Sequence, residues 1–181
     1  MTSLPHRAGP ATPEDRARLE QLVRALYPAV WRLCACLVDD AAAQDLVQET
    51  FLRATSALPG FRGEANARTW ILAIARHVCM DELRARYRRS RRDTRLRSVT
   101  APAPAGGDPA SDFEARELVA HLSPDRRSAF VLTQLLSLSY AEAAEICDCP
   151  LGTIRSRVAR AREDLIALAE PGRAQQSATG P

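Results

Sequence analysis

The chain has 181 residues, of which 46% are hydrophobic and 26% charged, a composition typical of globular proteins and sufficient for one ordinary domain or two small ones. Its 25 basic residues are all arginine and leave a net charge of only +3, but they cluster, so the total understates the local field. No apolar run reaches the length of a membrane span and no export signal opens the chain, which predicts a cytoplasmic protein without membrane insertion.

The cysteines and the motif content argue against catalysis. Five cysteines occur without a CxxC motif, which indicates neither a disulfide framework nor a zinc site. Cys147 and Cys149 flank an expected turn, where a redox pair is one interpretation and small packing residues the favoured one. No glycine-rich phosphate loop, nucleophile motif or histidine–carboxylate cluster is present. We therefore expect no catalytic residue, no metal and no cofactor.

Apolar positions recur at helical spacing along most of the chain, and no segment alternates with period two, which predicts an all-α fold. Residues 1–13 are expected to be a disordered tail that ends in Thr12-Pro13, a capping hydroxyl followed by a proline that a first helical turn tolerates. Tyr27-Pro28 should interrupt the first helix, because proline lacks the amide proton that a helix interior uses. The stripe expected to be buried before this break consists of Leu19, Leu22, Val23 and Leu26.

A second helix is expected to run to about Val38. Asp39 and Asp40 are candidate caps for a third helix, which should extend to about Leu58. The inward face of the second helix consists of Val30, Leu33, Cys34 and Leu37.

Breaks in the pattern divide the chain into two small helical domains. Pro59-Gly60 ends the third helix, FRGEANA at 61–67 is expected to be a loop, and a long helix follows over about 68–87. Between Thr100 and Ser111 the composition shifts to Pro, Ala and Gly without apolar periodicity, which predicts a flexible linker.

The C-terminal domain is expected to be a helix-turn-helix. One helix is predicted at 113–122, and Ser123-Pro124 should open another. Ser139 and Glu142 have the spacing of a capping box, which predicts that another helix of this domain starts there. Residues 171–181 are expected to be a disordered tail.

The helix after the turn, from Thr153 onward, is rich in arginine. At 100° per residue its apolar residues share one face, and they are Ile154, Val158, Ala161, Leu165 and Leu168. The opposite side consists of Ser156, Ala159, Arg160 and Glu163, with Arg155 and Arg162 on one flank and Arg157 on the other. Arginine can bond guanine edges bidentately, and a small residue lets a helix sit deep in the major groove. DNA recognition is therefore favoured over a merely solvated face.

Two further segments have contrasting charge. Residues 82–97 contain eight arginines and two acids, and they are expected either to track a phosphate backbone or to form a solvated helix end leading into a disordered arm. In residues 45–53 the packing positions are Leu46, Val47 and Phe51, with Ala54 just beyond, and the polar face consists of Asp45, Gln48, Glu49 and Arg53. An acidic face favours a protein partner over DNA.

Three stretches, in this order, resemble signature segments of the extracytoplasmic-function (ECF) sigma factors, the minimal two-domain branch of the bacterial sigma-seventy family. They are DLVQETFLRA (45–54), FRGEANARTWILAIARHVCMDELR (61–84) and LSYAEAAEICDCPLGTIRSRVARAR (138–162). With the flanking helices the similarity covers roughly residues 14–170. The third stretch is especially similar to the actinobacterial sigma C-like subgroup.

The resemblance implies a function for each domain. Residues 14–97 would form sigma region 2, which binds the polymerase clamp and recognises and melts the minus-ten element. Residues 98–112 would be the linker, and residues 113–170 region 4, which binds the polymerase flap and reads the minus-thirty-five element. The implied partners are core RNA polymerase and promoter DNA, with an anti-sigma factor as a further candidate.

Particular residues acquire implied roles from the same resemblance. The residues implied to bind core polymerase are Asp45, Gln48, Glu49 and Arg53. Those implied to bind the minus-ten DNA are Phe61, Arg62, Asn66, Trp70, His77, Arg84 and Arg88, although Trp70 and Phe61 also fit a purely structural role. Those implied to bind the minus-thirty-five DNA are Arg155, Ser156, Arg157, Ala159 and Arg160, with Arg157 as a phosphate contact.

The predicted function is that of a non-enzymatic initiation factor that directs core RNA polymerase to promoters and helps open the DNA. The alternative is an autonomous helix-turn-helix regulator whose N-terminal helices dimerise or sense a ligand. Residues 45–84 distinguish the two hypotheses, because a simple repressor has no need for them.

Overall fold

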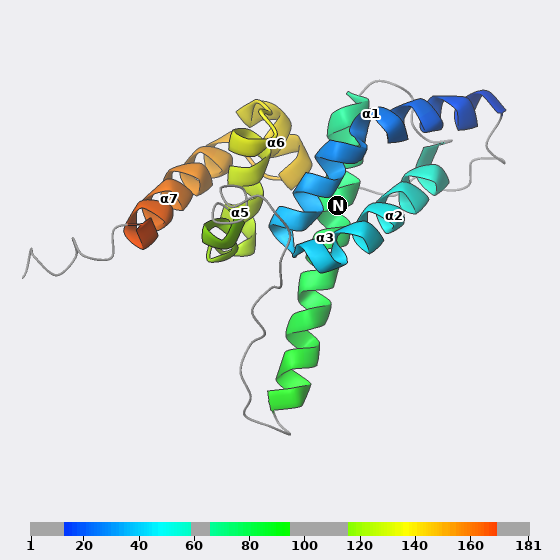
Figure 1. The fold of residues 1–181 in the computed structure, drawn as a ribbon. Helices are drawn as coiled ribbons and strands as arrows, with labels where there is room; N and C mark the ends of the chain where they lie inside the picture. The colour runs from blue at the N-terminus through cyan, green and yellow to red at the C-terminus, as the bar shows by residue number, and fades with distance from the viewer. Residues whose placement is uncertain (1–12, 59–65, 95–115, 170–181) are drawn as a thin grey trace, which may run out of the picture. The chain divides into compact units, whose positions relative to one another are not determined.

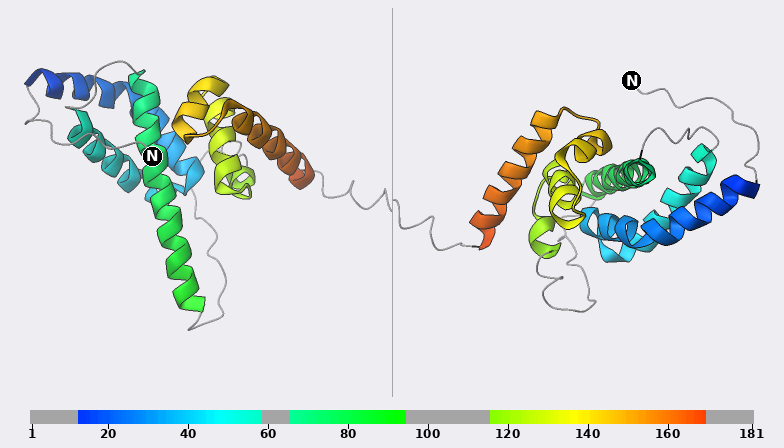
Figure 2. Two further views of the ribbon diagram at one scale, coloured as in Figure 1. Left: turned by 180° about the vertical axis from the view of Figure 1, so that it is seen from behind. Right: turned by 90° about the horizontal axis from the view of Figure 1, so that it is seen from above.

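The computed structural model describes residues 13–58, 66–94 and 116–169, and all the secondary structure in these ranges is helical. The chain divides into two compact units, Met1–Val99 and Thr100–Pro181 (Figures 1 and 2). The expectation of an all-α fold is therefore confirmed. The expected tails, the linker and most of the 61–67 loop lie outside the described residues.

Three helices pack together in the first unit: α1 (Pro13–Leu37), α2 (Asp40–Ala57) and α3 (Ala67–Thr94). Their contact buries one side of each helix, which is the main source of stability for helices of this kind. The largest fully buried side chains of this unit are Val30, Leu33, Cys34 and Leu37 from α1, Thr50 from α2, and Ile71 and Leu72 from α3.

Helix α1 corrects one expectation. Pro28 lies inside a continuous helix and does not end it, so the predicted break at Tyr27-Pro28 is wrong. Proline in a helix interior costs about 3 kcal/mol, but the residues that follow it offset this cost because they are fully buried. The predicted inward face is confirmed, since Val30, Leu33, Cys34 and Leu37 are all 0% exposed. Of the stripe expected before the proline, the described side chains of Leu22, Val23 and Leu26 are half-buried.

Asp39 links the start of α2 to α3. It is the N-cap of α2, as the sequence predicts, and its Oδ1 accepts a 2.8 Å hydrogen bond from the amide of Ala42. Its other oxygen is ion-paired with the guanidinium of Arg86 on α3. Partial burial alone would raise the pKa of Asp39, but the hydrogen bonds from Arg86 and Ala42 lower it below its ordinary value.

Replacing Asp39 should therefore separate a capping effect from a charge effect. Asp39→Asn keeps a good capping side chain and loses the ion pair, whereas Asp39→Ala loses both and should cost about 1 kcal/mol more in the free energy of unfolding. Both tryptophans, Trp31 and Trp70, lie in this unit, so urea titrations followed by tryptophan fluorescence report on its unfolding. Equal costs for the two variants would contradict a capping role for the Asp39 side chain.

The free energy of unfolding of the same variants should depend on pH in a defined direction. Because the pKa of Asp39 is lowered in the folded state, the ionised group contributes stability above its unfolded pKa of about 3.9, and this contribution is lost as the pH falls through the folded pKa. The difference between wild type and Asp39→Asn should shrink below about pH 4. Asp45→Asn, which removes an exposed carboxylate from the same helix, is the matched control.

Helix α3 is longer than expected. It continues to Thr94, seven residues past the predicted end at Tyr87, and its C-terminal half extends beyond α1 and α2 (Figures 1 and 2). Ion pairs between neighbouring turns support this extension, because Arg86 Nε and Arg89 NH2 each lie 2.8 Å from Oε1 of Glu82. The arginine-rich stretch is thus helical as far as Thr94 and not a disordered arm in that range.

The second unit contains a helix-turn-helix. A helical segment at 116–120 precedes α5 (Pro124–Phe130), which continues directly into a π-helical turn, η2 (Val131–Leu135). Helix α6 (Tyr140–Cys147) and helix α7 (Leu151–Ala169) then pack against these elements.

Local signals fix the boundaries of α6. The predicted capping box is confirmed, since Ser139 Oγ accepts from the amide of Glu142 at 3.2 Å and the Glu142 carboxylate accepts from the amide of Ser139 at 2.8 Å. Helix α6 ends where Asp148 adopts a left-handed conformation at φ 49°. Aspartate tolerates this conformation better than most residues, and the reversal turns the chain into α7.

The cysteines take part in packing. All five are free thiols, and only Cys149 is less than fully buried, in agreement with the expectation that Cys147 is a packing residue. Cys34 and Cys79 are neighbours in the core of the first unit. The hydrogen bond with Cys34, together with burial, raises the pKa of the Cys79 thiol far above its ordinary value, so this thiol stays protonated.

Candidate nucleic-acid and protein interfaces

Helix α7 is amphipathic in the manner that the sequence predicts. Ile154, Val158 and Ala161 are buried against the rest of the unit, with exposed fractions of 0%, 1% and 0%. Leu165 is half-buried, but Leu168 is 41% exposed, so its predicted inward position is wrong. The reason is length: α7 has 19 residues, whereas α5 and α6 have 7 and 8, and its last turn extends past them.

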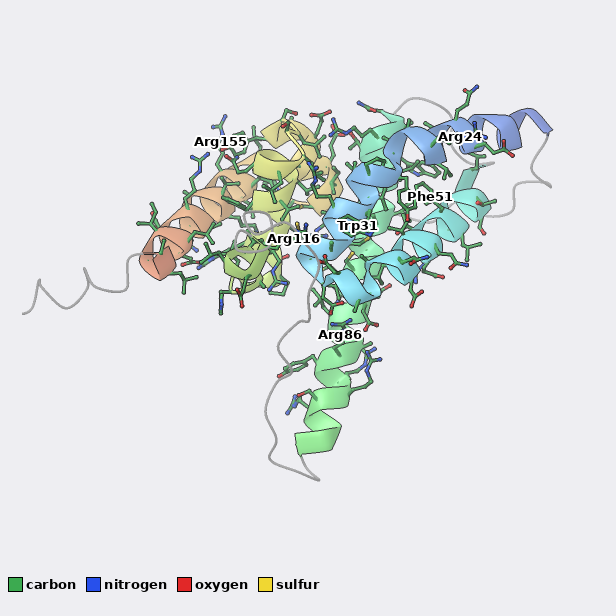
Figure 3. The ribbon with its side chains drawn as sticks, viewed as in Figure 1. Arg24, Trp31, Phe51, Arg86, Arg116 and Arg155 are labelled. Carbon is green, nitrogen blue, oxygen red and sulfur yellow. The ribbon has the colours of Figure 1, made fainter. Side chains whose placement is uncertain are left out.

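The opposite face of α7 is polar and exposed. It consists of Ser156, Ala159, Arg160 and Glu163, all of them exposed, with Arg155 exposed on one flank (Figure 3). Ser156 Oγ donates to the carbonyl of Thr153 at 2.9 Å, which fixes its hydroxyl at the helix surface. Arg155, Ser156, Ala159 and Arg160 thus form an exposed surface of two long cationic side chains and two small ones, with the acidic Glu163 one turn further on. A combination of arginines with small residues suits a helix that enters a major groove.

Arg157 occupies a different environment. Its side chain is only 23% exposed, and NH2 lies 3.0 Å from Oδ2 of Asp125 at the start of α5. NH1 lies 3.6 Å from the sulfur of Cys149 in the turn before α7. The structure therefore separates Arg157 from the other four residues that were predicted to bind the minus-thirty-five DNA, and places it between α5, the turn and α7.

Two further contacts hold α7 against α5 and η2, and the sequence pattern does not predict them. Arg126 on α5 is ion-paired with Asp164 at 2.6 Å, and Arg162 donates to Oε1 of Gln134 in η2 at 2.8 Å. The partners are 38 and 28 residues apart in the chain, so no local pattern signals them. Together they hold both sides of α7.

Helix α2 presents the acidic face expected from the sequence. Asp45, Gln48 and Arg53 are exposed and Glu49 is half-buried, while Leu46, Val47 and Ala54 are buried. Phe51, predicted to pack, is half-buried (Figure 3).

Charge pairing orders part of the acidic face. Arg53 Nε lies 2.8 Å from Oε1 of Glu49, and NH1 lies 3.2 Å from Oδ2 of Asp81 on α3. The hydrogen bond with Glu49 is the main reason that the pKa of Arg53 is raised above its ordinary value, and the contact with Asp81 adds to it. Arg53 therefore remains charged. Leu52, which is 57% exposed, adds an apolar side chain beside this face that the sequence pattern did not predict.

The start of α3 carries the described residues predicted to bind minus-ten DNA. The Asn66 carbonyl accepts from the amide of Trp70 at 3.0 Å, and its Oδ1 accepts from the amide of Arg68 at 3.0 Å, so Asn66 begins the helix. Trp70 is half-buried against a cluster that contains Ala54 and Leu58. Phe61 and Arg62 lie outside the described residues.

Further along α3 the predicted residues are exposed. His77 is exposed, with its Nδ1 3.3 Å from the carbonyl oxygen of Ala73. Arg84 is ion-paired with Asp81 at 3.3 Å, and Arg88 is exposed. Taken at 100° per residue, Trp70, His77, Arg84 and Arg88 lie within about 40° of arc on one side of α3.

The described ranges contain no group of three or more His, Cys, Asp or Glu side chains placed to hold a metal ion. None of the helices in those ranges is both long enough and apolar enough to cross a bilayer.

Comparison with known proteins identifies both units. The sequence model described as Sigma-70 region 2 matches residues 22–89, and that described as Sigma-70, region 4 matches residues 112–165. The chain is 50% identical over 157 residues to the ECF RNA polymerase sigma factor SigC of Mycobacterium tuberculosis, covering 84% of each.

Two other comparisons agree. The chain is 35% identical over 162 residues to the ECF RNA polymerase sigma-E factor of Haemophilus influenzae, covering 82% of this chain and 86% of the relative. The solved sigma factor RpoE of Bartonella quintana, in complex with the anti-sigma factor NepR, superposes with a TM-score of 0.72 at 30% identity. That match covers 86% of this chain and 99% of that one.

Proposed function

Since the chain belongs to the ECF sigma factors of bacterial RNA polymerase, which direct core polymerase to specific promoters and help open the DNA, we propose how its surfaces divide this work. The first unit would be region 2, with boundaries near residues 14–97, and the second region 4, near residues 113–170. The resemblance stated from the sequence, including its sigma C-like character, is confirmed. The comparisons give no support to an autonomous regulator.

Helix α7 would read the minus-thirty-five duplex. The observation that carries this proposal is the surface formed by Arg155, Ser156, Ala159 and Arg160, which faces away from the buried side of a helix held by contacts on both flanks. Arg155 and Arg160 would bond base edges, and Ala159 would allow close approach or contact a thymine methyl group. Arg157 would position the helix through Asp125.

The start of α3 would capture a base of the opened minus-ten strand. A flipped base requires a stacking surface and polar groups that bond its edge. Trp70 and His77, with Asn66 at the helix start, supply such groups on one side of α3. Phe61 and Arg62 belong to the same proposal on the basis of the resemblance, and Arg84 and Arg88 would add positive charge nearby.

His77→Ala should change which base is preferred at one minus-ten position and leave polymerase binding intact, because His77 is exposed on the DNA side of α3 and lies on a different helix from Asp45 and Gln48. Transcription from a promoter library randomised across the minus-ten element would measure the preference. His121→Ala, which removes an exposed histidine from the other unit, is the control. Unchanged promoter selectivity in the His77 variant would exclude this histidine from base recognition.

The acidic face of α2, formed by Asp45, Gln48 and Glu49, would bind the clamp of core polymerase, with Arg53 holding Glu49 in place. An anti-sigma protein is a further proposed partner, supported by the complex of the Bartonella relative. We propose that the chain itself catalyses no reaction and that it acts in the cytoplasm, where RNA polymerase works.

Reconstitution tests the whole proposal. Core polymerase supplemented with this chain should initiate at a defined set of promoters, which sequencing of transcript 5′ ends would reveal. A footprint with and without core polymerase separates the hypotheses, because a sigma factor should protect promoter DNA only in the holoenzyme. Specific protection by the purified chain alone would favour the autonomous regulator.

A further inference from the structure

Four side chains of alternating charge connect α2 to α3. On α2, Arg53 Nε lies 2.8 Å from Oε1 of Glu49. Arg53 also reaches α3, where its NH1 lies 3.2 Å from Oδ2 of Asp81. The other oxygen of Asp81, Oδ1, lies 3.3 Å from NH1 of Arg84. Arg53 therefore has two acidic partners, and Asp81 has two basic ones.

The two ends of this charge network lie on the two surfaces proposed above. Glu49 belongs to the acidic face of α2, and Arg84 belongs to the side of α3 that carries Trp70 and His77. At 100° per residue, Asp81 falls on the same side of α3, about 40° from His77. The exposed fractions of the four charged side chains range from 44% to 67%, so their pairing can change without opening the core.

Asp81 is a carboxylate on a surface that is proposed to bind DNA. While it is paired with Arg84, it neutralises a cation that would otherwise attract phosphate. Arg53 competes with Arg84 for this carboxylate, and Arg53 is itself shared with Glu49. An arginine that has lost its second partner can bind both oxygens of one carboxylate in the stronger bidentate geometry. Removal of Glu49 from Arg53 therefore favours the release of Arg84 from Asp81.

We propose that Asp81 is a positioning residue that couples the binding of core polymerase to the binding of minus-ten DNA. In the free chain, Asp81 neutralises Arg84. When a basic group of the polymerase clamp binds Glu49, Arg53 turns to Asp81 alone. Arg84 then becomes available to the DNA. This inference rests on the proposed functions of α2 and α3.

A short single strand tests this coupling. It would carry the nontemplate minus-ten segment of a promoter found by 5′-end sequencing. Its affinity for the free chain and for the holoenzyme would be measured by fluorescence anisotropy at low ionic strength, where surface charges are weakly screened. The ratio of the holoenzyme affinity to the free-chain affinity is the coupling factor. Wild type would be compared with Asp81→Asn and with the matched control Glu20→Gln, which removes the same charge from an exposed site on α1.

Asp81→Asn should raise the affinity of the free chain by about two- to fivefold more than that of the holoenzyme, the range expected for an exposed ion pair. The coupling factor should fall by the same ratio. Glu20→Gln should keep the wild-type coupling factor, because a general gain of positive charge acts on both affinities alike. In an Arg84→Gln background, Asp81→Asn should leave the coupling factor unchanged, since its effect acts through Arg84.

Glu49→Ala provides a second test from the other helix. It removes the acidic partner of Arg53, so Arg53 should bind Asp81 alone even without polymerase, and the free chain should bind the single strand more tightly. This gain should also require Arg84. Tryptophan fluorescence would establish that each variant is folded.

An unchanged coupling factor in the Asp81 variant would overturn the inference, as would the same fall in the Glu20 variant or a fall that persists when Arg84 is replaced. The proposed function fails separately, because in that case the wild-type holoenzyme would not distinguish the promoter strand from a scrambled one.

Discussion

Asp45→Arg is expected to lower the affinity of the chain for core RNA polymerase by about a hundredfold. Asp45 is exposed on α2 beside Gln48, and Glu49 is partly committed to Arg53. Reversing the charge places a cation where the acidic face should meet a basic partner surface, and like charges across an interface cost several kcal/mol. Because Asp45 is not buried, the free energy of unfolding should change little.

Affinity would be measured by competition with a labelled reference sigma factor for core polymerase. Glu20→Arg is the matched control, since it makes the same reversal of charge at an exposed site on α1 of the same unit. A second variant, Leu52→Ala, should weaken binding by a smaller factor, because it removes an exposed apolar side chain next to the charged face. Retention of full affinity by Asp45→Arg would move the polymerase-binding surface away from this face of α2.

Arg160→Ala is expected to cost about 1 to 3 kcal/mol at one base pair of the minus-thirty-five element, or roughly a 5- to 150-fold loss of affinity on the preferred sequence. The side chain is exposed opposite the buried face of α7, so its loss would remove the proposed base contact without opening the core. The preference at that base pair should relax, while preferences at the other positions persist.

Transcription from promoters with each minus-thirty-five position substituted in turn would measure both effects. Arg162→Ala removes the same charge from the same helix, but its guanidinium is held by Gln134, so the base preferences should stay as in wild type. A uniform loss over all sequences in the Arg160 variant would reassign this arginine to a phosphate contact and leave base reading to Arg155.

Local chemistry made much of the fold predictable. The caps at Asp39 and Ser139 depend on side chains that bond amides three residues away, and the buried faces of α1 and α7 follow the helical period. In such signals the interacting residues lie within one or two helical turns of each other, so a short stretch of sequence contains all of them. The three signature stretches likewise indicated the family, because each combines apolar positions that pack inward with polar positions at a fixed spacing.

Other features depend on contacts between distant residues. Pro28 would end an isolated helix, and only the burial of the residues after it in a three-helix unit allows α1 to continue. The extension of α3 past Tyr87 is supported by Asp39, which is 47 residues away from Arg86. The ion pair that holds Arg157 requires Asp125, 32 residues away. The helical period places all these side chains on the correct element without indicating their partners.

Helix α3 is unbroken, so it fixes the distance between the residues at its two ends. One helix of fixed rise carries Trp70 and His77 toward one end and Arg88 and Arg91 toward the other, so the distance between the proposed base-binding groups and the arginines would not adjust to the DNA. One nucleotide inserted between those two points would shift the phosphates by about 3.4 Å relative to the arginines. Promoters served by this chain should therefore tolerate almost no variation in length at that position.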